Sequence, residues 1–250
     1  MSCEKVIDID LKSADKKFVI EANLSNQAGN CRVLLTRTKD FDESNSFEGV
    51  TGALVTIREE GGATTALGAV QDGVYESATL AGTSGKTYHL SVQVDGQEFT
   101  ATSTMPVFVR LDTIYVTRET LFSDGQLIVN AEFQDPPGPG NNYRFIQYFN
   151  GVKEDQLQFM NDDYTDGRYV NSKLFYFNDD DEDDLKQGDE VLVEMYTIDA
   201  NMYKYWFSLF RSSTGDSNQA TPSNPVSNMQ GGALGYFSAH TKQSKGMVIP

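Results

Sequence analysis

The sequence is poor in cysteine and basic residues, and it has no long hydrophobic run. Two cysteines, Cys3 and Cys31, are too few for a disulfide framework or a four-ligand zinc site. Lys and Arg number 20 against 36 Asp and Glu, and the net charge of −16 repels nucleic acid and anionic membrane surfaces. A transmembrane helix needs about eighteen consecutive apolar residues. We therefore expect neither nucleic-acid binding nor a membrane-spanning helix.

Catalytic motifs are also missing from the sequence. His89 and His240 are the only histidines, they fall in different halves of the chain, and no cysteine–histidine pair is suggested. No serine lies in a Gly-x-Ser-x-Gly turn, and residues 231–235 do not open a helix as a dinucleotide-binding loop would. So many acidic residues always allow some carboxylate pair, which gives no support for a glycosidase. We therefore expect no enzyme and no organic cofactor.

The first part of the chain has the pattern of short strands separated by turn residues. Alternation of apolar and polar residues between glycine-containing turns predicts strands. The Asp95-Gly96 pair predicts a tight hairpin between the last two of them. This pattern is typical of an immunoglobulin-like or transthyretin-like β-sandwich, which we expect over residues 16–106. The predicted strands are 18–24, 31–36, 53–57, 73–76, 85–94 and 97–102.

Residues 107–250 predict a second β-rich domain that contains one packed α-helix. Met105-Pro106 marks the boundary, and a glycine-rich loop near the end of the chain leads into a short strand around Tyr236. Asp199 is a favourable N-cap for a helix near 200–213. The predicted strands are 111–117, 127–133, 143–149, 173–177 and 191–198. The apolar stripe of the helix, which we expect to be core rather than a cofactor site, is Met202, Tyr205, Trp206, Leu209 and Phe210.

A dense acidic run resembles part of a calcium-binding loop. Asp179, Asp181, Asp183 and Glu190 occupy positions one, three, five and twelve of an EF-hand loop. The match fails at position six, where Asp184 replaces the glycine that the sharp turn requires. It also fails after the loop, where a strand follows instead of a second helix. The EF-hand interpretation is therefore not supported, although these four residues remain calcium candidates.

Two other interpretations of the acidic run stay open. A different oxygen-rich calcium site would form if a second acidic loop supplied Asp162, Asp163 and Asp166 as further ligands. The favoured interpretation is a solvated hairpin tip between Phe177 and Val191, because runs of charge usually face solvent.

The position of Cys3 suggests a lipid anchor. A mature bacterial lipoprotein carries its acylated cysteine at its N-terminus, and here Cys3 is followed by polar Glu4 and Lys5. Two alternatives are an incidental thiol and a disulfide with Cys31. No secretory signal with a charged start and an apolar centre precedes Cys3 in this sequence.

Four segments together resemble a known family. They are 3–10, 50–57, 88–92 and 227–237, and the most specific are the opening cysteine-glutamate and the closing Gly-Gly-x-x-Gly-Tyr-Phe. They are similar to the Bacteroidota lipoprotein family known as domain of unknown function 4249, over essentially the whole chain. The resemblance implies an outer-membrane lipoprotein acylated at Cys3 and usually encoded beside a TonB-dependent transporter. It brings no catalytic residues.

These observations lead to one functional expectation and one alternative. We expect a non-catalytic lipoprotein at the cell surface or the periplasmic face of the outer membrane, tethered by residues 1–15. In this role it would be a binding accessory of a TonB-dependent transporter. The alternative is a surface protein with a structural or adhesive role.

Overall fold

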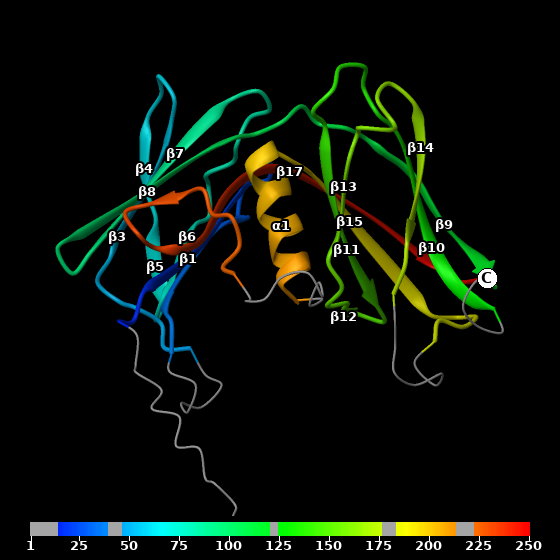
Figure 1. Cartoon of the computed structure of the whole chain (residues 1–250), viewed down its shortest axis with the longest axis horizontal. Helices are drawn as coiled ribbons and strands as arrows, with labels where there is room; N and C mark the ends of the chain where they lie inside the picture. Colours follow the sequence, from blue (N-terminus) through cyan, green and yellow to red (C-terminus); the bar gives the residue numbers. More distant parts are fainter. Residues whose placement is uncertain (1–14, 40–46, 121–124, 177–183, 214–222) are drawn as a thin grey trace, which may run out of the picture.

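The structure is a computed structural model that describes residues 15–39, 47–120, 125–176, 184–213 and 223–250. Within these residues the protein is mainly β, with several sheets and one helix (Figure 1). The expectation of β-sandwich architecture with one packed α-helix is therefore confirmed.

The N-terminal half supplies eight strands. Six correspond to predicted strands, and the additional β4 and β5 are short and largely exposed, so they lack the apolar alternation that predicts a strand. Asp95 and Gly96 have φ of 50° and 71°, as the predicted hairpin turn requires. The strands are β1 (Phe18–Ser25), β2 (Cys31–Arg37), β3 (Leu54–Glu59), β4 (Thr64–Ala66), β5 (Gly68–Gln71), β6 (Val74–Ser77), β7 (Thr87–Val94) and β8 (Gln97–Thr104).

The C-terminal half supplies the remaining strands and the helix α1 (Ala200–Ser213). The strand predicted at 173–177 lies earlier, as β14, and residue 177 is outside the described residues. The strands are β9 (Leu111–Glu119), β10 (Gln126–Gln134), β11 (Asn142–Phe149), β12 (Val152–Lys153), β13 (Gln158–Asn161), β14 (Tyr169–Leu174), β15 (Glu190–Ile198), β16 (Met229–Gln230) and β17 (Leu234–Val248).

One nine-stranded sheet connects the two halves. Its order is β12-β11-β15-β17-β1-β2-β6-β5, with β13 paired to β11. The strand β17 lies parallel to β1 through its first half and antiparallel to β15 through its second half. The prediction of a short strand around Tyr236 is wrong, because β17 is 15 residues long and its polar second half is held by pairing with β15. The segments predicted as separate domains thus share a continuous sheet.

The two faces of the nine-stranded sheet are covered differently. Its inner face packs against two smaller sheets, β16-β8-β7-β3-β4 and β14-β10-β9, and so encloses two hydrophobic cores. Phe237 and Ala239 of β17 belong to the N-terminal core, and Met247 on the same side of the strand packs against the C-terminal core. Its outer face carries α1, which stands in front of β17 at the centre of Figure 1.

Asp199 caps α1, as predicted, and also ties the helix to the N-terminal half. Its Oδ1 atom accepts a hydrogen bond from the Met202 backbone N–H at 2.9 Å. Its Oδ2 atom accepts hydrogen bonds from the Ser103 hydroxyl at 2.5 Å and the Thr104 backbone N–H at 3.2 Å, both at the end of β8. The Asp199 carboxylate therefore caps α1 and also forms hydrogen bonds with the end of β8.

Substitution of Asp199 tests this double role. We expect Asp199→Ala to lower the free energy of unfolding by about 2 kcal/mol, because the cap and the bonds to β8 are lost together. Asp199→Ser is the matched control, since serine can still cap the helix but is too short to reach β8 at the same time. Urea denaturation should rank the serine variant between wild type and alanine, and equal stability of alanine and wild type would contradict the assignment.

Candidate functional site

A pocket of about 520 Å³ lies on the outer face of the nine-stranded sheet beside α1. Side chains at alternate positions of β11, β15, β17 and β1 point to this face, since successive residues of a strand point to opposite sides. The helix closes one side of the pocket with Trp206, a residue that is 7% exposed. The aromatic and basic residues that matter most for its chemistry are Tyr148, Tyr196, Tyr236, Arg144, Lys153 and Lys242.

Arg144 and Trp206 form the centre of the pocket wall. The guanidinium carbon of Arg144 lies 3.7 Å from the centre of the Trp206 ring, a cation–π contact. Tyr205 and Tyr236 hold the indole in place with ring centres 5.1 Å and 5.3 Å away. Burial lowers the pKa of Arg144, although a guanidinium remains protonated in proteins. The pocket thus contains a fixed positive charge on an aromatic support.

Glu194 is the centre of a network formed with three residues that line the pocket. Lys242 Nζ lies 2.7 Å from Glu194 Oε1. The hydroxyls of Tyr148 and Tyr196 both donate to Glu194 Oε2, the first at 3.3 Å. Burial, reinforced by the bonded carboxylate, raises the pKa of both tyrosines. Glu194 therefore has its charge and its lone pairs already engaged.

His240 is buried beneath the pocket. Its Nδ1 atom lies 2.9 Å from the Ser238 hydroxyl, and its ring makes an edge contact with Tyr196 at 5.0 Å. Burial lowers the pKa of His240 to about 3, and the nearby charges of Arg144 and Lys242 act in the same direction. The imidazole is therefore neutral and weakly basic at neutral pH.

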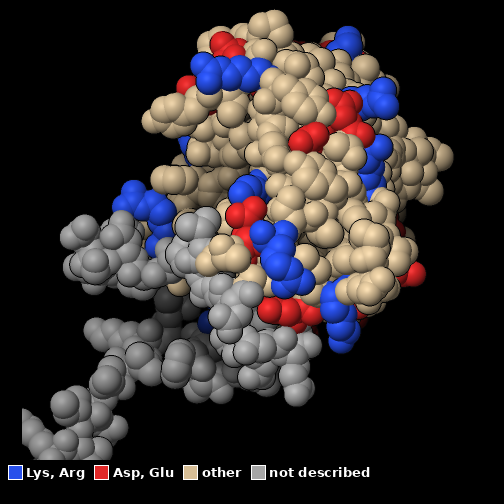
Figure 2. Space-filling view, turned by 90° about the vertical axis from the view of Figure 1, so that its right-hand side faces the viewer, with Lys and Arg blue, Asp and Glu red and all other residues tan. Residues whose placement is uncertain are grey.

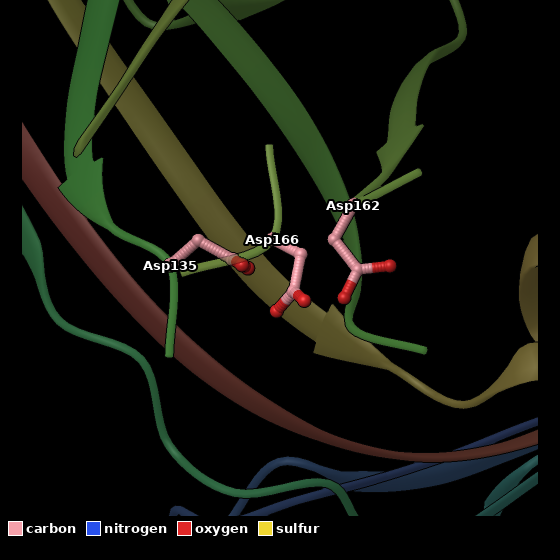
Figure 3. Close-up of side chains that lie close together, drawn as sticks. All are labelled: Asp135, Asp162 and Asp166. Carbon is pink, nitrogen blue, oxygen red and sulfur yellow. The ribbon is translucent and has the colours of Figure 1, made fainter. Parts of the chain in front are cut away.

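A second group of interest consists of three aspartates at one end of the C-terminal half (Figure 3). Asp135 follows β10, Asp162 follows β13, and Asp166 precedes β14; one carboxylate oxygen from each lies within 4.8 Å of the others. The sequence predicted Asp162 and Asp166 as calcium candidates but missed Asp135. Asp163 lies elsewhere, accepting a hydrogen bond from Asn161 at 2.6 Å.

The three aspartates brace two loops against each other. Asp162 accepts hydrogen bonds from the backbone N–H groups of Gly140 and Asn141, the latter at 2.9 Å. Asp166 accepts from the Gly138 N–H at 2.7 Å. In the reverse direction, Asp135 accepts from the Gly167 N–H at 3.0 Å and from the Tyr143 hydroxyl. The only sequence signal for Asp135 was its place beside the proline-rich loop 136–140.

Loss of the Asp162 carboxylate is expected to be costly. We expect Asp162→Ala to lower the free energy of unfolding by about 2 kcal/mol, because the partly buried N–H groups of Gly140 and Asn141 lose a charged acceptor. Asp163→Ala, which removes the exposed neighbouring carboxylate, should change stability by less than about 0.5 kcal/mol. Chemical denaturation of the two variants measures the difference, and equal stabilities would contradict the bracing role.

The same three carboxylates could hold a cation, because oxygen atoms are the ligands that calcium prefers. Thermal unfolding at millimolar calcium separates the two roles. A shared cation raises the midpoint of wild type but not of Asp166→Asn. An unchanged midpoint assigns the cluster to loop bracing alone.

Of the other predicted site residues, Glu190 is the one that the structure describes. Cys3, Asp179, Asp181 and Asp183 lie outside the described residues. Glu190 is exposed at the start of β15, where its backbone N–H donates to Asn150 Oδ1 at 2.9 Å.

The remaining cysteine, Cys31, lies in the N-terminal core. It is a buried free thiol, and burial raises its pKa to about 12. This thiol is therefore a core residue and a poor nucleophile.

The surface at the C-terminal end of the molecule carries charges of both signs. There, Lys and Arg side chains lie among Asp and Glu side chains instead of gathering in one patch (Figure 2). Such a mixed surface does not produce a strong field of one sign.

Among the described residues, no helix is both long and apolar enough to cross a membrane.

Comparison with known proteins gives one informative match. No curated protein matches the chain. The family model described as "Domain of unknown function (DUF4249)" matches residues 4–246. Since this match covers nearly the whole sequence, the protein belongs to the DUF4249 family.

Proposed function

We propose that the protein is a non-catalytic, ligand-binding lipoprotein of the outer membrane that serves a TonB-dependent transporter. The observation that carries the binding role is the pocket of about 520 Å³ between α1 and the outer face of the nine-stranded sheet. A cavity of this size, with aromatic walls and convergent polar groups, is typical of small-molecule sites.

The chemistry of the lining favours binding over catalysis. A general base works best when its pKa is near the working pH, whereas that of His240 is lowered to about 3. Glu194, the most buried carboxylate nearby, is engaged by Lys242 and two tyrosine hydroxyls. The properties of His240 and Glu194 therefore favour a binding site over a site of general acid–base catalysis.

Recovery of bound molecules tests the binding role. The tagged protein is purified from the native host, desalted and denatured, and released small molecules are identified by mass spectrometry. Wild type should release a defined molecule. The matched control, Asn23→Phe, places a ring into the pocket from β1 and should release none. Equal recovery from both proteins would show that the pocket is not the site.

The proposed anchor is a lipid on Cys3. Thioether diacylation together with amide acylation provides several acyl chains, and two or more chains hold a protein stably on a membrane. Residues 4–15 would then form the tether that leads to β1. This part of the proposal rests on family resemblance and on the position of Cys3. Mass spectrometry of the mature protein from its native host tests it, and an unmodified Cys3 would refute it.

The proposed partner is a TonB-dependent transporter in the same membrane. The test is an affinity pull-down from solubilised outer membranes, with an unrelated tagged lipoprotein as control. Recovery of one transporter in stoichiometric amount supports the accessory role. Recovery of nothing specific favours the alternative of a structural or adhesive surface protein.

A further inference from the structure

We propose that the pocket binds a small, hydroxyl-rich anion and that Arg144 holds its carboxylate or phosphate group, with Lys153 as a second cation. This inference rests on the proposed binding function and specifies the chemistry of the ligand. Carboxylate and phosphate share the geometry that a guanidinium recognises, namely paired oxygen atoms that accept parallel hydrogen bonds.

The first observation is that no described residue accepts a hydrogen bond from Arg144. A guanidinium carries five N–H donors. Among the residues that the structure describes, Arg144 forms neither an ion pair nor a hydrogen bond, and its guanidinium carbon lies 3.7 Å from the centre of the Trp206 ring. A desolvated charge without a partner is unfavourable. Stacking covers only the face of the guanidinium, so its edge is left for an oxyanion.

The second observation is that nearby carboxylates do not neutralise Arg144. Glu194 is paired with Lys242 at 2.7 Å, and Glu76 lies 3.6 Å from Arg32. Glu21, on the outer face of β1, forms no ion pair with Arg144 among the described residues; burial raises the pKa of its carboxyl group, while the more distant charges of Arg144 and Lys153 partly oppose that rise. The tyrosines around Arg144 have raised pKa values and stay neutral. No carboxylate of the described residues therefore forms a direct ion pair with Arg144, which leaves its N–H donors available to a ligand.

The third observation is the sign of charge in the pocket. Its lining includes four basic residues and one acidic residue, Glu76, although the whole protein has a net charge of −16. Lys153 is exposed at the edge of the sheet and, like Arg144, has no ion pair among the described residues. A concave site with an excess of one sign of charge concentrates ligands of the opposite sign. The basic lining residues are Arg32, Arg144, Lys153 and Lys242.

The rest of the lining indicates what the anion carries. Four neutral polar side chains complete the pocket: Asn23, Ser25, Asn30 and Ser238. Amides and hydroxyls can exchange hydrogen bonds with ligand hydroxyl groups. The aromatic rings beside them offer flat apolar surfaces to a ring or carbon chain. A molecule with several hydroxyls and one anionic group matches this combination.

Intrinsic fluorescence provides a direct measurement, because Trp206 is the only tryptophan in the sequence and lines the pocket. The purified full chain is titrated with glucuronate, glucose 1-phosphate and glucose, which share one ring and differ in the anionic group. We expect a saturable change of Trp206 emission with at least one anion, at a concentration at least tenfold lower than with glucose. The stronger of the two anions identifies carboxylate or phosphate as the preferred group.

Variants assign the effect to Arg144. Arg144→Gln should weaken binding of the preferred anion by at least tenfold, and Lys153→Gln by several-fold. Arg144→Lys should fall between wild type and Arg144→Gln, because lysine keeps the charge but loses the paired donors. Arg58→Gln, on the exposed side of β3 away from the pocket, is the matched control and should bind as wild type does.

A stability readout separates ligand binding from a structural role. Because Arg144 is desolvated without a partner, Arg144→Gln should keep or raise the thermal midpoint of the ligand-free protein. A large fall in the midpoint would assign Arg144 to structure and overturn the inference, as would equal binding of glucose and the anions, unchanged binding by Arg144→Gln, or no response to either anion. The ligand-recovery experiment tells the two proposals apart: a neutral molecule released from wild type refutes the anion and leaves the binding function intact.

Discussion

Replacing Gly235 with alanine is expected to lower the free energy of unfolding by at least about 3 kcal/mol. Gly235 lies in β17 opposite Ile20 of β1 and has a φ of +96°, a conformation that residues with a Cβ rarely adopt. A Cβ atom there would lie 2.1 Å from the Ile20 carbonyl oxygen. Relief of this clash requires the two central strands to separate, and those strands connect both halves of the sheet.

A nearby glycine provides the control. Gly232 has a φ of +90°, but a Cβ added there would meet nothing within 4 Å. Gly232→Ala should therefore cost only the backbone strain, about 1–2 kcal/mol. Urea denaturation of both variants isolates the close approach of β17 to β1 as the difference between them. Equal losses of stability would show that the close approach contributes nothing.

Acidification is expected to destabilise the protein through His240. Burial lowers the pKa of this imidazole from its ordinary value of 6.5 to about 3. Between these values the unfolded chain takes up a proton that the folded protein does not. The contribution of His240 to stability is therefore fully present above pH 6.5 and is lost as the pH falls. The loss for one such group approaches about 1.4 kcal/mol per pH unit, or about 2 kcal/mol between pH 6.5 and 5.

Chemical denaturation at pH 7, 6 and 5 checks this expectation. His240→Asn, which keeps a neutral polar group near the Ser238 hydroxyl, should show a flatter pH dependence than wild type. His89→Asn is the control, because His89 is partly exposed on β7 and should leave the wild-type slope in place. If wild type and His240→Asn lost stability in parallel, the assignment to His240 would be wrong.

The candidate site was only partly accessible to prediction. Acidic residues at 162 and 166 stood out as possible ligands, but their partner Asp135 was isolated in the sequence and carried no motif. Arg144 was not identified either, since it lies in a strand that was predicted from its composition and that carries no binding motif. Trp206 was assigned to the core, and the structure shows it both buried and lining the pocket. The contacts that were not predicted all join residues that are distant in the sequence.

The sequence by itself determined the mainly β character, most strand positions, the hairpin at Asp95-Gly96 and the helix that begins after Asp199. These features depend on backbone preferences and side-chain periodicity within a few residues, so local sequence is sufficient to predict them. Only the tertiary structure decided that β17 joins β1 to β15 and that Arg144 meets Trp206. Strand pairing across more than two hundred residues is set by which arrangement buries both cores at once, and no local pattern contains that information.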